Sequence, residues 1–68
     1  MTYVITMTTF DERKPQNITI KGNEAVALGI AYMLEHDRNA LEINVYRVDE
    51  KNPMGIKIYE KNFYGNLK

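Results

Sequence analysis

Hydrophobic and polar residues alternate in four short stretches of the chain, with the period of two that is typical of strands with one buried face. Two of the stretches, residues 2–10 and 17–21, precede the middle of the chain, and two, residues 41–46 and 56–61, follow it. β-Branched and aromatic residues are frequent in them, as is usual for strands. The alternation therefore predicts four strands, two on each side of a central segment.

The central segment, residues 23–37, has the pattern of a helix. Asn23 can cap its first turn through the side-chain oxygen, and Glu24 places a negative charge at the positive end of the helix dipole. Large apolar residues recur at helical spacing, widened by Ala27, and predict the face that packs on the sheet: Val26, Ile30, Met33 and Leu34. Gly29 weakens a helix by about 1 kcal/mol relative to alanine, so we expect its backbone to approach the sheet closely.

The predicted order of elements is ββαββ. Two hairpins joined by a helix can form one four-stranded sheet with the helix packed on one face, which is an α+β fold. If the helix runs back along the sheet, the strands on either side of it are parallel, and so are the first and last strands. The strand order 2-1-4-3 would place those two in the middle, and in element order it resembles β-grasp domains. The alternative order keeps strands 2 and 3 adjacent as a parallel pair.

The length and charge of the chain narrow the class of protein. Its 68 residues suit one hydrophobic core, so we expect a single domain over residues 1–68. Nine basic residues balance nine acidic ones, which removes the positive field of a typical nucleic-acid-binding domain. The sequence shows neither a basic leader nor a long apolar run, so we expect no signal peptide, no membrane span and a cytoplasmic protein.

The sequence offers little chemistry for catalysis or for a cofactor. It has no cysteine, which excludes disulfides, thiolate metal ligands and a thiol nucleophile. The single histidine, His36, lies between two acidic residues, but neighbouring helix residues point about 100° apart and cannot converge on one ion. Glycine-rich phosphate-binding motifs are absent, and residues 65–68 lack the paired glycines of conjugated ubiquitin-like proteins. We therefore expect no enzyme, no metal and no cofactor.

Two predicted surfaces carry residues that the core does not explain. On the helix, Leu28 and Tyr32 lie one turn apart and face away from the predicted core stripe. Phe63 and Tyr64 can either cover them or join them in an interface. On the sheet face without the helix we expect a group of aromatic and basic residues: Tyr46, Lys57, Tyr59 and Lys61. Such groups are typical of single-strand nucleic-acid binding, although tyrosine is also ordinary on a solvated strand.

These surfaces give two hypotheses about function. The first is a small non-enzymatic protein-interaction module: an inhibitor, adaptor or accessory factor of the kind carried by phages or plasmids. It would bind another protein, or a second copy as a homodimer, through an open sheet edge or through Leu28, Tyr32, Phe63 and Tyr64. The alternative is a weak single-stranded nucleic-acid binding module that uses the open sheet face.

The open edges of the predicted sheet differ in their protection. In the order 2-1-4-3 the edges are the second and third strands. The second strand carries one outward charge, Lys21, whereas the third carries Glu42 and Arg47. Charged residues on an edge strand discourage pairing with another chain. We therefore expect the second strand to be the edge that is open to a partner.

Overall fold

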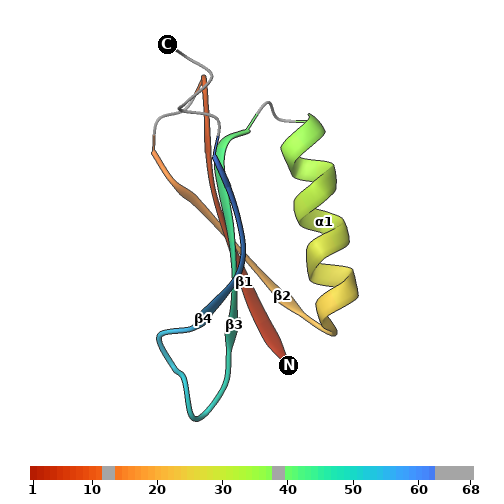
Figure 1. The fold of residues 1–68 in the computed structure, drawn as a ribbon, viewed down its shortest axis with the longest axis vertical. Coiled ribbons are helices and arrows are strands. Elements are labelled where there is room, and N and C mark those ends of the chain that lie inside the picture. Colours follow the sequence, from red (N-terminus) through yellow and green to blue (C-terminus); the bar gives the residue numbers. More distant parts are fainter. Residues whose placement is uncertain (12–13, 38–39, 63–68) are drawn as a thin grey trace.

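The computed structural model describes residues 1–11, 14–37 and 40–62, which form one four-stranded sheet and one helix (Figure 1). In chain order the elements are β1 (Thr2–Thr9), β2 (Gln16–Lys21), α1 (Glu24–Asp37), β3 (Ala40–Val48) and β4 (Ile56–Asn62). The predicted α+β fold and its ββαββ order are thus confirmed. No helix in the described ranges has the length and apolar character needed to cross a membrane.

The strands lie in the order β2-β1-β3-β4, and every neighbouring pair is antiparallel. The predicted order 2-1-4-3 is therefore wrong, and so is the alternative with strands 2 and 3 adjacent. Both the predicted and the observed order keep the two hairpins and differ only in which strand of the second hairpin lies beside β1. β3 is almost entirely buried along its first six residues, whereas most of β4 is exposed. The more apolar strand therefore takes the central position, and the charged one takes the edge.

The helix α1 covers one face of the sheet and packs mainly over the central strands β1 and β3 (Figure 1). The predicted alternation in β1 is confirmed, because Tyr3, Ile5 and Met7 are buried and the residues between them are less so. Ile43 and Val45 of β3 are fully buried beside them. Among the described elements, none covers the opposite face, which we call the open face.

The face of α1 that packs on the sheet differs from the predicted stripe. Ala27 and Ala31 are fully buried and define the line of closest contact. Val26 and Met33, predicted to lie in the core, are 48% and 62% exposed. Because the side chains of Ala27 and Ala31 are small, the helix backbone lies near the sheet at these two residues. Larger residues then pack on either side of the contact line. The half-buried residues of α1 in this position are Leu28, Ile30 and Leu34.

The helix begins as predicted, but the reason expected for its glycine is wrong. The Val26 N–H donates a hydrogen bond to Asn23 Oδ1 at 2.9 Å, which confirms the cap. At Gly29, no atom outside the helix's own backbone and its chain neighbours lies within 4 Å of the position that a Cβ would take. The backbone therefore does not approach the sheet at Gly29, because the contact line runs along another side of α1.

The turn between β3 and β4 is held by its own side chains. The Asn52 N–H donates to Asp49 Oδ1 at 2.8 Å, and the Gly55 N–H donates to Asn52 O at 3.0 Å. Gly55 has φ +89°, and a Cβ there would lie 3.1 Å from Tyr46 Cβ. Both facts explain why glycine stands at this position.

Candidate functional site

A register shift between β3 and β4 decides where several predicted site residues lie. Val45 pairs with Tyr59, but the next residue of β3, Tyr46, pairs with Lys57. Ile58 is therefore an extra residue in β4, a β-bulge. A shift by one residue exchanges the two faces of a strand. Tyr59 thus lies on the face covered by the helix, and the prediction that it lies on the open face is wrong.

The residues beyond the bulge contact the helix and form a polar cluster. Lys61 pairs with Ile43, which faces the core, so Lys61 also lies on the helix side rather than on the open face. The Tyr59 hydroxyl donates a hydrogen bond to Glu35 Oε1 at 2.8 Å, and Lys61 Nζ lies 3.1 Å from Glu35 Oε2. The Tyr32 ring meets the Tyr59 ring edge to face at 5.3 Å between centroids. We call Tyr32, Glu35, Tyr59 and Lys61 the helix–β4 cluster.

The electrostatics of the helix–β4 cluster are those of a structural contact. Burial raises the pKa of Tyr59 to about 12, with a further contribution from its hydrogen bond to Glu35. Burial would also raise the pKa of Glu35, but the hydrogen bonds from Tyr59 and Lys61 outweigh it and hold that pKa below its usual 4.5. At neutral pH the carboxylate is ionised, the phenol is protonated, and the Glu35 side chain is only 8% exposed. The cluster therefore joins α1 to β4 and presents no free nucleophile or base.

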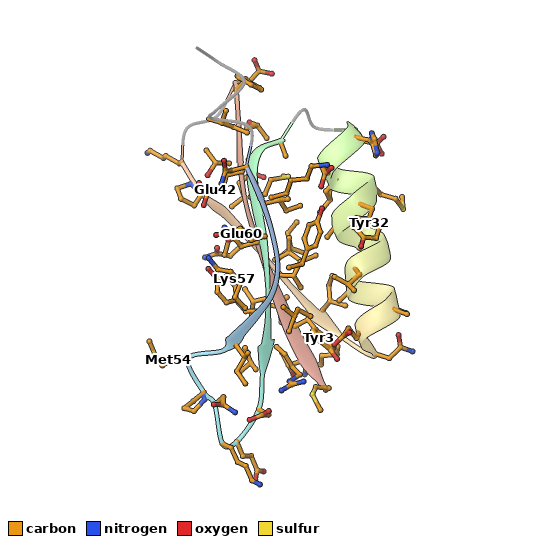
Figure 2. All side chains as sticks on the ribbon, viewed as in Figure 1. Tyr3, Tyr32, Glu42, Met54, Lys57 and Glu60 are labelled. Carbon is orange, nitrogen blue, oxygen red and sulfur yellow. The ribbon has the colours of Figure 1, made fainter. Side chains whose placement is uncertain are left out.

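The predicted helix surface is only partly present. Leu28 is half-buried against the core, so the expectation that it faces away is wrong, because it lies next to the contact line of Ala27 and Ala31. Tyr32 is 47% exposed and packs against Tyr59 (Figure 2). The other two residues predicted for this surface, Phe63 and Tyr64, lie outside the described residues.

The open face keeps two of the four residues predicted for nucleic-acid binding, Tyr46 and Lys57. Lys57 Nζ lies 5.8 Å from the centroid of the Tyr46 ring, a cation–π distance. The same ammonium group lies 2.7 Å from Glu60 Oε2, and this hydrogen bond raises the pKa of Lys57 (Figure 2). The open face therefore presents a paired lysine beside one tyrosine.

A groove of ≈350 Å³ lies on the open face beside Tyr46. It is lined by residues of three strands and of the β3–β4 turn: Val4, Thr6, Asn17, Tyr46, Val48, Pro53 and Met54. Met54 at its rim is 93% exposed. The groove mixes apolar walls with the hydroxyls of Thr6 and Tyr46 and the amide of Asn17, and its lining among the described residues includes no charged side chain.

Among the described strands, β2 has no neighbour on its outer side. Ile18 and Ile20 point to the helix side and are half-buried, whereas Thr19 and its neighbours on the open face are exposed. The prediction that β2 is an edge is confirmed, but the other edge is β4 rather than β3. β4 is guarded by its bulge and by three charged residues: Lys57, Glu60 and Lys61.

The helix flank toward β2 is also uncovered by the residues that the structure describes. Tyr32 and Glu35 lie on the flank toward β4, since they contact residues of that strand. Helical geometry places the exposed Val26 and Met33, together with Ile30, on the other side of the buried alanines, hence toward β2. We call this flank and the edge strand the β2 edge surface; its residues are Ile18, Ile20, Val26, Ile30 and Met33.

Only the strand part of the β2 edge surface was predicted as a partner site, because its helix residues were assigned to the core. The signal that could have found it is the pair Ala27 and Ala31, one turn apart, which marks a contact line for small residues. Within the described residues, no three His, Asp or Glu side chains gather closely enough to hold a metal ion.

Comparisons of the chain with protein-family models, with curated proteins and with solved structures find no match.

Proposed function

We propose that this protein is a small, non-enzymatic protein-interaction module that binds its partner through the β2 edge surface. The observation that carries the proposal is that an edge strand and exposed apolar side chains of α1 lie on the same side of the molecule. Val26 and Met33 are 48% and 62% exposed on the helix flank toward β2, and β2 ends the sheet in the described part of the chain. An interface of this kind can use backbone hydrogen bonds and apolar contacts together.

The strand supplies the backbone part of the interface. An edge strand presents a row of N–H and C=O groups that can pair with a strand of another chain. β2 offers six residues and a single charge, Lys21 at its end. It has none of the bulges and few of the charges that usually prevent such pairing.

The helix flank supplies the apolar part and gives specificity to the contact. Ile18 and Ile20 are half-buried on the helix side of β2. On α1, Ile30 is half-buried and Val26 and Met33 are exposed. A strand added to β2 would place alternate side chains on this helix side. Burial of apolar surface contributes roughly 25 cal/mol per Å², so a partner with apolar residues at alternate positions is favoured over a polar one.

The nucleic-acid alternative has less support from the geometry. A stacking platform needs its aromatic and basic residues on one face. Tyr46 and Lys57 lie on the open face, whereas Tyr59 and Lys61 lie against the helix. Of the two lysines predicted for this group, Lys57 remains on the open face and is paired with Glu60.

Affinity capture from the native host tests the proposal. The bait variants are wild type, Val26→Glu/Met33→Glu, and the control Met54→Glu/Ile56→Glu, which adds the same charge at exposed positions of the β3–β4 turn region. We expect proteins that wild type and the control retain to be lost from the Val26→Glu/Met33→Glu variant. Circular dichroism should show that all three baits are folded. Identical retention by all three baits would contradict an interface at the β2 edge surface.

A further inference from the structure

We infer that the β2 edge surface binds a second copy of this chain, in a two-fold dimer whose sheet continues from β2 into the β2 of the partner. This inference rests on the proposed function, because it names the occupant of the same surface. It is argued from the self-complementarity of β2, from the position of the helix and from the charges along both edges of the sheet.

The sequence of β2 is complementary to itself when it pairs antiparallel about Thr19. In that register Ile18 lies opposite the partner's Ile20, and Ile20 lies opposite the partner's Ile18, all on the helix side. Thr19 lies opposite the partner's Thr19 on the open face, where threonine pairs are favourable. A two-fold axis perpendicular to the sheet makes each of these contacts twice.

The charges along β2 agree with this register. Lys21 is the single charged residue of the strand, and it lies opposite the partner's Asn17 rather than opposite another lysine. Like charges that face each other across a strand pair are destabilising, and none do so here. The other edge is less suitable, because β4 carries Lys57, Glu60 and Lys61 and a bulge that interrupts the regular row of backbone groups.

The helix leaves the outer edge of β2 open to a partner. α1 runs back over the sheet from the end of β2 (Figure 1) and packs mainly over β1 and β3, so among the described elements none lies along the outer side of β2. In the dimer the four isoleucines of the two β2 strands would lie together on the helix side.

A charge exchange at Thr19 tests the dimer and its register. Thr19 is exposed and lies on the open face, so the folded monomer can accept a charged residue there. Thr19→Lys would place two lysines opposite each other at the axis, and Thr19→Glu would place two glutamates there. We expect wild type to dimerise in sedimentation equilibrium, and each variant alone to associate about tenfold more weakly. An equimolar mixture of the two variants should recover the wild-type affinity.

The control is Met54→Lys, which adds the same charge on the β3–β4 turn rather than on the paired strand and should associate like wild type. Concentration-dependent protection of the β2 amides from hydrogen exchange should accompany association and be lost in Thr19→Lys. A wild-type monomer at high micromolar concentration, or variants whose mixture associates no better than either alone, would overturn the inference. Wild type could also be a monomer that captures a protein which the Val26→Glu/Met33→Glu variant does not capture. That result would overturn the dimer and leave the proposed function standing.

Discussion

At the scale of single residues, Glu35 and Tyr59 show how a contact distant in sequence depends on one extra residue. Alternation from Ile56 through Ile58 would carry Glu60 onto the core face and Tyr59 onto the open face. The bulge at Ile58 reverses both positions. Tyr59 then reaches Glu35 of α1, and Glu60 reaches Lys57 on the opposite face. In the sequence, the signal of the bulge was Glu60, a charged residue at the position that regular alternation assigns to the core.

The Glu35–Tyr59 contact should make stability depend on pH at both ends of the scale. The pKa of Tyr59 in the folded protein, about 12, is above its usual 10. Its contribution to the free energy of unfolding is therefore complete below pH 10 and is lost as the pH rises through 12. The folded pKa of Glu35 lies below 4.5, so its contribution is present above pH 4.5 and is lost as the pH falls through the folded value.

Urea unfolding of wild type and Tyr59→Phe across this range measures the effect. Between pH 10 and 12, wild type should lose on the order of 2 kcal/mol of its free energy of unfolding more than Tyr59→Phe does. The comparison between the two proteins removes the ionisation of the other tyrosines. Parallel curves for the two proteins in alkali would mean that the Tyr59 hydroxyl is not buried against Glu35.

At the scale of elements, α1 is attached to the sheet by small residues in its middle and by polar residues on its β4 flank. Ala27 and Ala31 are fully buried, and the helix–β4 cluster holds the flank. The flank toward β2 has no comparable contact among the described residues. This asymmetry leaves Val26 and Met33 exposed, although their spacing is that of a core stripe.

Two substitutions in α1 test where its contact line lies. Gly29→Ala should raise the free energy of unfolding by about 1 kcal/mol, because the position is helical and a Cβ there meets no other atom. Ala31→Leu should lower it by roughly 1–3 kcal/mol, because the added atoms enter a closely packed interface. Chemical denaturation measures both. If leucine were tolerated at 31 and alanine harmful at 29, α1 would be rotated relative to the structure.

The parts of the fold that depend on neighbouring residues could be predicted from the sequence. The cap at Asn23, the turn at Gly55 and the inward residues of β1 all follow from local chemistry. The strand order was predicted wrongly, because it depends on a comparison between two distant strands: β3 is more apolar than β4 and therefore lies beside β1. In the candidate site, β2 was predicted as an edge from the order 2-1-4-3, which is correct for the first hairpin and wrong for the second. Leu28 was placed on the wrong side because the helix face depends on packing.

At the scale of the whole molecule, the chain is small, and its described residues leave one sheet face and one helix flank uncovered. A folded chain of 68 residues buries a smaller share of its surface than a larger one does, so its stability is marginal. Pairing through β2 would extend the sheet and cover its open edge. Folding and association should therefore be linked in this protein.

The linkage predicts that the melting temperature of wild type rises with protein concentration. When a dimer unfolds to two separate chains, each tenfold increase in concentration adds about 1.4 kcal/mol per dimer to its stability. For a dimer of this size that corresponds to roughly 5 °C. Calorimetric scans over a hundredfold range of concentration measure the shift. Thr19→Lys should show little or no dependence over the lower part of this range, because its dimer dissociates before it unfolds. An equal shift in both proteins would indicate association through another surface, and no shift in wild type would indicate that the chain is stable without a second copy.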